Sequence, residues 1–189
     1  MMYETHRVGG VCSGVIASTV LFSSNFGVTE LLSSSIIVAS ATIGSLTPDI
    51  DHPTSRVGKK FLLKPFSIFL NKFFGHRTIT HSVIVAILMT IVLFSLSTMT
   101  TGVLNYIYTN AVIGYSVGYF SHLLLDMFTV EGIPVFYPLI KRKYRLAKFK
   151  TGKSKKKEEI VSIIMILITG IIMAIYLLGW KYLMYRSGM

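Results

Sequence analysis

Cysteine is almost absent from this sequence of 189 residues, with Cys12 as its only example. A single cysteine excludes an intrachain disulfide and any zinc module built from several cysteines. Because Cys12 lies among Gly and Ser in an apolar run, we expect it to pack as a buried thiol. The sequence also lacks an internal repeat and a Gly-rich phosphate-binding loop.

Charge is the second scarcity. Charged residues make up only 14% of the chain, against 52% hydrophobic residues, and the mean hydropathy is +0.62. This balance is poor for a soluble domain and typical of a protein that crosses a membrane several times. Only 8 residues are acidic against 19 Lys and Arg, so the net charge is +11. Such a charge can indicate nucleic-acid binding, but its distribution favours another explanation.

Apolar segments dominate what is present. A spanning helix needs about 20 mostly apolar residues, and five segments approach this: 8–22, 31–46, 82–99, 103–128 and 160–178. In segment 61–74, a helix would place Lys64, Ser67 and Asn71 on one face and mostly Phe and Leu on the rest. This favours an interfacial helix over a re-entrant or buried loop helix. We therefore expect an all-α membrane protein with about five transmembrane helices plus an interfacial amphipathic helix. Residues 1–189 would form a single integral membrane domain.

The basic residues predict the orientation of these helices. Lys and Arg concentrate in segments 53–77 and 139–157, whereas segments 23–30 and 100–102 have none. Cytoplasmic loops carry the excess of Lys and Arg. Both basic segments are therefore cytoplasmic if the N-terminus is cytoplasmic and five helices alternate in direction. The positive charge then serves topology and attraction to anionic membrane lipids, and we expect no direct nucleic-acid binding.

The histidines follow a restricted pattern. All five, with three of the acids, lie in four short polar clusters at residues 5–6, 48–52, 76–82 and 121–126. The predicted topology places each cluster at the cytoplasmic end of a helix. Polar groups of this kind are costly near a bilayer unless they are paired or bind an ion. His and Asp are also ligands for Zn and similar divalent metals. The pattern indicates one shared metal site.

Spacing within the clusters refines this expectation. His122 and Asp126 are four residues apart on a predicted helix and therefore share a face. Asp49 and Asp51 would point the same way in an extended turn, where they would repel each other without a cation. Arg77 can bind phosphate in a bidentate manner. The alternative is that these residues are separate helix caps and interface residues, which is the better explanation for any one of them alone.

The same residues resemble those of the YdjM-type family, described as LexA-binding, inner-membrane-associated metal-dependent hydrolases. The matching pieces are Thr5-His6 with Gly9 or Gly10, residues 44–53, His76-Arg77 with Thr80-His81-Ser82, and residues 118–126 followed by Thr129 and Gly132. The resemblance implies hydrolysis. A more distant likeness to the all-helical, zinc-dependent phospholipase C proteins implies a phosphoester, although the chain lacks a His-rich set for three zincs. No motif accounts for the LexA association.

These observations predict a hydrolase of the inner (cytoplasmic) membrane, multi-pass with a cytoplasmic N-terminus, that acts on a phosphoester or lipid head group through Zn, with Mn or Mg as alternatives. The predicted metal ligands are His6, Asp49, Asp51, His81, His122 and Asp126. The predicted catalytic residues are His52, His76 and Arg77, the histidines as general base or in support of the ligands. Two non-enzymatic alternatives stay open: a scaffold that binds a protein partner around a structural metal, and an ion or proton path.

Overall fold

The computed structural model describes residues 1–22, 27–60, 63–75, 77–150 and 155–187, and the side chains only up to 179. It is all-helical. Its elements are α1 (Tyr3–Phe22), α2 (Val28–Gly44), η1 (Pro48–Asp51), α3 (Lys64–Phe74), η2 (Ile79–His81), α4 (Val83–Ser97), α5 (Gly102–Met127) and α6 (Lys155–Ser187), where η denotes a short 3₁₀ helix. Among the described residues no strand forms, and only two isolated β-bridges occur.

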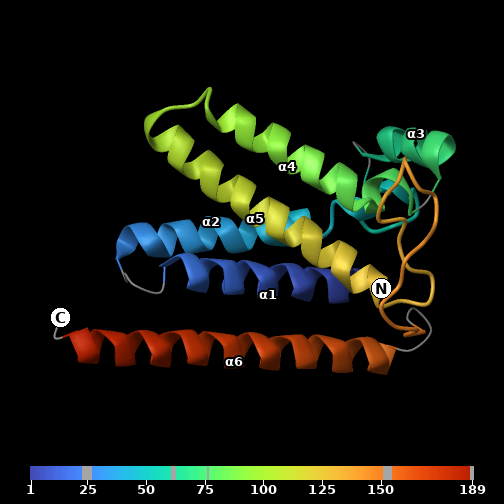
Figure 1. Ribbon diagram of the computed structural model, residues 1–189. Helices are drawn as coiled ribbons and strands as arrows, with labels where there is room; N and C mark the ends of the chain where they lie inside the picture. The colour runs from blue at the N-terminus through green and yellow to red at the C-terminus, as the bar shows by residue number, and fades with distance from the viewer. Residues whose placement is uncertain (23–26, 61–62, 76, 151–154, 188–189) are drawn as a thin grey trace.

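Three helices form the centre of the bundle: α1, α2 and α5 pack against one another (Figure 1). Glycines bring them close together. A Cβ on Gly118 would lie 1.9 Å from the carbonyl oxygen of Ala41, and one on Gly44 would lie 2.1 Å from that of Tyr115. Only the absence of a side chain permits this approach of the α2 and α5 backbones. The close approach fixes the register of the two helices whose ends carry Ser45 and His122.

The outer helices present apolar side chains to their surroundings. α4 packs on α5, and α6 lies along α1 with few buried residues (Figure 1). Ile87, Ile91 and Leu178 are each about half exposed or more, as are many other large apolar residues on these two helices. A soluble monomer rarely exposes apolar area so extensively. These faces are suited to contact with lipid.

Two helices are long and apolar enough to cross a membrane, judged by length and composition: 28–51, with a mean hydropathy of 1.4, and 155–179, with a mean hydropathy of 2.8. α4 is apolar but has 15 residues, which is about 22 Å of helix. α1 and α5 are long but carry many Gly, Ser and polar residues. The helical class is confirmed, whereas the prediction of about five transmembrane helices is not.

Segment 61–74 is helical from Lys64 onward, with Pro65 in the first turn, and residues 61–62 lie outside the described part. Its polar face turns toward the protein: Ser67 is buried, and Asn71 Nδ2 donates to the carbonyl of Asp51 at 3.0 Å. Phe66, Phe69 and other aromatic residues point outward. The polar face of α3 therefore contacts the η1 turn. From amphipathicity alone, this face would be expected to lie in water.

The segment after α5 is more structured than expected. We predicted 139–157 as a basic cytoplasmic loop, but residues 128–150 fold back on the end of α5. Ile133 and Tyr144 exchange both backbone hydrogen bonds, at 3.0 and 2.8 Å, and Leu146 N donates to the carbonyl of Met127 at 2.7 Å. Both β-bridges lie in this segment. The 128–150 loop is thus attached to the helix end that carries Asp126.

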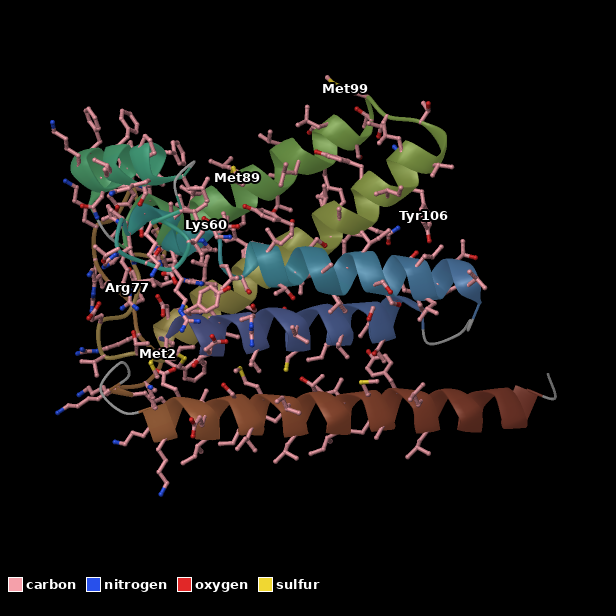
Figure 2. All side chains as sticks on the ribbon, turned by 180° about the vertical axis from the view of Figure 1, so that it is seen from behind. Met2, Lys60, Arg77, Met89, Met99 and Tyr106 are labelled. Atoms are coloured by element: carbon pink, nitrogen blue, oxygen red, sulfur yellow. The ribbon has the colours of Figure 1, made fainter. Side chains whose placement is uncertain are left out.

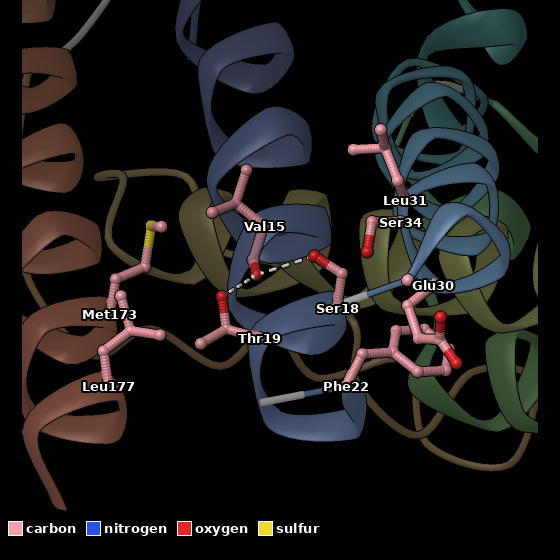
Figure 3. A pocket seen from close by; sticks show the side chains of 10 residues that line it. Val15, Ser18, Thr19, Phe22, Glu30, Leu31, Ser34, Met173 and Leu177 are labelled. Atoms are coloured by element: carbon pink, nitrogen blue, oxygen red, sulfur yellow. Dashed lines mark hydrogen bonds between the residues drawn. The ribbon is translucent and has the colours of Figure 1, made fainter. Parts of the chain in front are cut away.

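A cavity of about 360 Å³ lies between α1, α2 and α6 (Figure 3). Its walls are mostly apolar, with Val15, Phe22 and Leu31 among them, and Glu30 is its acid. It lies at the end of the bundle away from the N-terminus, and no histidine lines it. The position of this cavity therefore does not identify the polar site.

Candidate metal centre

One end of the bundle collects the predicted metal ligands. The first turns of α1, the η1 turn after α2, η2 before α4 and the last turns of α5 all meet there (Figure 1). Figure 2 shows Arg77 and Met2 at this end, and Met99 and Tyr106 at the other. His6, Asp51, His81, His122 and Asp126 are all buried. Sequence reasoning predicted this convergence from alternating helix directions.

Three imidazole rings form the centre of the cluster. The rings of His6 and His122 stack with centroids 3.7 Å apart and planes inclined by 14°. The ring of His81 meets that of His122 edge-on, and their Nε2 atoms are 3.2 Å apart. These side chains come from α1, η2 and α5, so three separate segments contribute one ring each.

Contacts at the far side of the His122 and His81 rings determine which of their nitrogens faces the centre. Nδ1 of His122 is 2.7 Å from the carbonyl oxygen of Ser45, which can only accept. That nitrogen is therefore the protonated one, and Nε2 presents a lone pair to the cluster. Nδ1 of His81 lies 3.3 Å from Asp51 Oδ2. It also lies 3.0 Å from Thr80 Oγ1, whose hydroxyl donates to the same carboxylate at 2.6 Å. Because the Thr80 hydrogen is used on Asp51, the Thr80 oxygen accepts from His81, which favours the proton on Nδ1.

The two Nε2 atoms then direct lone pairs at each other across 3.2 Å. Two acceptors repel at this distance unless a proton or a cation lies between or beside them. His6 adds a further unsatisfied group: its Nδ1 has no hydrogen-bond partner in the described part of the chain, and its Nε2 lies 3.3 Å from Asp126 Oδ1 without forming a hydrogen bond. Buried polar atoms are rarely left this way. These orphaned nitrogens fit a bound cation.

Two carboxylates approach the rings. Asp126 Oδ2 lies 3.5 Å from Nε2 of His81 and 3.8 Å from Nε2 of His122, and Asp49 Oδ1 lies 3.9 Å from the same His122 nitrogen. Two groups of three residues therefore have ligand atoms within 4.8 Å of one another. They are His6, His122 and Asp126, and Asp49, His81 and His122. His122 is common to both, and the shared face predicted for His122 and Asp126 is present.

Asp51 occupies a different place from Asp49. We expected both to face one cation from an extended turn, but residues 48–51 form a 3₁₀ helix, in which residues two apart point in different directions. Asp51 Oδ2 accepts from Thr80 Oγ1 at 2.6 Å and from the backbone N–H of Arg77 at 2.9 Å. It lies behind His81, outside both ligand groups. The expected extended turn is therefore wrong.

Cationic groups also reach the cluster. Arg77 contacts Asp126 Oδ2 at 3.0 Å and Glu131 at 2.7 Å, and its side chain is 12% exposed. The amino group of Met1 lies 2.8 Å from Asp126 Oδ1. Arg77 itself adopts a positive φ of 56°, uncommon for a residue other than glycine. Arg77 and the amino group of Met1 thus already compensate part of the negative charge of Asp126. A bound metal ion would have to share this carboxylate with them.

The remaining predicted catalytic residues lie differently. His52 is partly exposed, and its Nδ1 lies 2.9 Å from Thr54 Oγ1. His76 lies outside the described residues, so the prediction for it stays untested. Ser82 directly precedes α4 but its side chain does not cap the helix; its hydroxyl donates to the carbonyl of Tyr137 at 2.6 Å.

Sequence reasoning missed Glu158. This acid follows three lysines at the start of α6 and is only 4% exposed. It accepts hydrogen bonds from the Thr5 hydroxyl and, at 3.3 Å, from the backbone N–H of Met2. It therefore joins α6 to the turn of α1 that carries His6. The available signal was a pair of acids, Glu158 and Glu159, directly after a basic run.

Comparison with known proteins identifies the family of the chain. The family model described as YdjM inner membrane protein matches residues 1–186. The chain belongs to this family. It is 34% identical over 152 residues to the uncharacterized protein YvsG of Bacillus subtilis, which covers 80% of this chain and 82% of that protein.

The inner membrane protein YdjM of Escherichia coli is 35% identical over 127 residues, which is 66% of this chain and 60% of that protein. The Shigella flexneri protein of the same name matches equally. No solved structure matches the chain. The family resemblance drawn from the four polar clusters is therefore confirmed, and family membership supports a location in the inner membrane.

Proposed function

We propose that this YdjM family protein is a metal-dependent hydrolase that acts on a phosphoester or lipid head group at the cytoplasmic face of the membrane. The observation that carries the proposal is the meeting of the Nε2 atoms of His81 and His122 at 3.2 Å, beside Asp126. Separate caps and interface residues would not need to bring two imidazole acceptors together. A divalent cation would turn this repulsion into attraction.

The ligands in this proposal are His6, Asp49, His81, His122 and Asp126, which make up the two overlapping groups. Each imidazole nitrogen has one lone pair, so the Nε2 of His122 can bind only one ion. The overlapping groups therefore describe one ion per chain. We reassign Asp51 from ligand to the residue that orients His81, as the Ser45 carbonyl orients His122.

The metal in this proposal is Zn, because three imidazoles suit it well. Mn or Mg is the alternative, because carboxylates also contribute. When bound, a divalent cation supplies a charge that polarises a phosphoryl oxygen and activates water. Arg77 holds two N–H groups toward acidic oxygens at the cluster, so the same fork can hold the oxygens of a phosphate.

A general base must accept a proton from water within hydrogen-bond reach of the substrate. His52 and His76 stay our candidates: His52 belongs to neither ligand group, and His76 lies outside the described residues. His52 lies one residue beyond η1, whose Asp49 approaches the cluster. Of the residues in the two groups, Asp49 is the one with exposed side-chain surface, 19%, so we place the approach of water and substrate on its side.

We also propose the membrane arrangement of five spanning helices, α1, α2, α4, α5 and α6, with the N-terminus in the cytoplasm. The ends gathered at the cluster support it: α1 and α6 begin there, and α2 and α5 end there, as alternate crossings require. α3 would lie at the interface with its aromatic residues toward lipid. The excess of Lys and Arg in segments 53–77 and 139–157 then lies in the cytoplasm.

One observation favours a non-enzymatic alternative. Asp126 pairs with Arg77, which also pairs with Glu131, so part of the cluster is a charge-compensated network without any ion. Such a network would suit a scaffold for a protein partner, with a metal as a structural element. An ion or proton path across the membrane would need polar groups along the length of the bundle. The two ligand groups lie at one end of it, which disfavours such a path.

Turnover of a chromogenic phosphodiester separates these functions. Full-length protein purified in detergent would be treated with a chelator and then reloaded with Zn or Mn, beside His81→Ala and a matched control, Lys72→Gln, on the exposed face of α3. The proposal expects hydrolysis that is lost on chelation, restored by the cation and absent from His81→Ala. Stoichiometric metal without hydrolysis of phosphomonoester or phosphodiester probes would support the structural role instead.

A further inference from the structure

We propose that a cavity in the 128–150 loop is a phosphate-binding subsite that receives the phosphorylated group of the substrate beside the metal centre. The inference rests on the proposed function for its role in catalysis, but the binding itself needs no metal. The cavity measures about 430 Å³ and is lined by Glu131, Arg142, Lys143, Tyr144 and Arg145. Three of these five residues are cationic, in a cavity large enough for a phosphate and a small head group.

The fold of the loop fixes the backbone from which the exposed cationic side chains extend. The backbone pairs of Ile133 with Tyr144 close it, and Gly132 makes this closure possible with a φ of 62°. A Cβ on Gly132 would lie 2.4 Å from the carbonyl oxygen of Tyr144. A loop that only supplied positive charge for topology would not need this pairing. The construction therefore indicates a specific arrangement of the cations.

The side chains suit an anion with several oxygens. The guanidinium of Arg142 lies over the ring of Tyr144, with Cζ 5.8 Å from the centroid, and this contact uses none of its N–H donors as hydrogen bonds. Arg145 donates one bond to the carbonyl of Val130 at 3.3 Å and keeps further donors. A planar guanidinium binds two oxygens of a phosphate at once. Lys143 adds a third charge to the lining.

A short chain of ion pairs connects the cavity to the metal centre. Glu131 lines the cavity and lies 2.7 Å from Arg77, and Arg77 lies 3.0 Å from Asp126. A phosphate in the cavity would therefore be separated from the ligands by one arginine that can itself bind phosphate oxygens. Glu131, the acid in this lining, repels an incoming anion. It would keep the subsite weak until the ligand replaces it on Arg77.

Binding of inorganic phosphate and of dihexanoyl phosphatidic acid, measured by calorimetry on chelator-treated full-length protein in detergent, tests the subsite. Arg142→Gln should weaken binding roughly 10- to 100-fold, because a charge-assisted hydrogen-bond pair is lost. Glu131→Gln should strengthen it. Arg7→Gln is the matched control: the same charge is removed from an exposed arginine, paired with Glu4, elsewhere in the molecule.

If both probes bind, a free phosphate is sufficient for recognition by the subsite. If only the phosphatidic acid binds, the subsite recognises a lipid head group. Either result supports the subsite. Absence of saturable binding by both probes, or equal losses in Arg142→Gln and Arg7→Gln, would overturn it, because only diffuse charge would then be present. A protein that binds phosphate normally but hydrolyses no phosphoester would contradict the proposed function and leave the subsite intact.

Discussion

Among single residues, His122 and His81 matter most through the nitrogen that each turns toward the centre of the cluster. The Ser45 carbonyl determines this for His122, and Asp51 does so for His81. Neither relationship was visible in the sequence. Ser45 contributes a backbone oxygen, and the direction of Asp51 depends on the 3₁₀ turn. Residue types and spacing predicted the members of the cluster, whereas the hydrogen bonds behind them required tertiary contacts.

Asp51 and Asp126 should therefore respond differently to the same change. Asp51→Asn leaves the ligands in place and weakens the orientation of His81, so metal affinity should fall by about 10- to 100-fold. Asp126→Asn replaces a carboxylate that faces three imidazoles with a neutral amide, and bound metal should be lost. Titration of chelated protein with Zn measures both, with the exposed Glu159→Gln as the matched control. Equal, small losses in both variants would show that neither carboxylate binds an ion.

At the scale of elements, helix periodicity and hydropathy predicted most of the helices. They placed α1 too late in the chain, because Thr5 and His6 are polar but are buried against neighbouring segments. They could not predict that the 128–150 loop pairs with itself, or that Glu158 accepts hydrogen bonds from α1. Such contacts join segments far apart in the sequence, and local pattern carries no information about them.

The contact between α2 and α5 gives a prediction about packing. Gly118→Ala would place a methyl group 1.9 Å from the carbonyl oxygen of Ala41, so the helices must separate. We expect the free energy of unfolding to fall by about 1–3 kcal/mol, the usual cost of overpacking. His122, one turn later, should also lose its bond to Ser45. Thermal unfolding in detergent measures the loss.

Gly170→Ala is the control for this change, because a Cβ there meets nothing within 4 Å. It should leave the melting temperature unchanged or raise it, since alanine favours helix more than glycine does. If both variants melted at the same temperature as the wild type, the close approach of α2 and α5 would be incorrect.

At the scale of the whole molecule, one end of the bundle is polar and carries the site, and the helices present apolar faces along their length. Composition predicted this character, and the family comparison supports a location in the inner membrane. The number of crossings is harder to predict, because α1 and α5 mix glycine and polar residues with apolar ones. The glycine and polar residues of α1 and α5 pack against neighbouring helices or belong to the site. They also lower the mean hydropathy of both helices, so that hydropathy alone does not identify them as membrane spans.

Orientation is tested by labelling in intact cells. After Cys12 is replaced by Ala, a cysteine at Lys156 should resist a membrane-impermeant thiol reagent, whereas one at Thr101 should react. Both positions are exposed in the structure, so access to the reagent decides the result. The reverse labelling pattern would place the cluster outside the cytoplasm.

Elemental analysis of the purified protein shows whether His122 belongs to a site for one metal ion. The wild type should contain about one divalent ion per chain, since the single lone pair of the His122 Nε2 is shared by both ligand groups. His52→Ala should keep that ion, because His52 belongs to neither group. His122→Ala should lose nearly all of it and melt at a lower temperature, because binding stabilises the folded state. Equal metal content in the three proteins would contradict a site that includes His122.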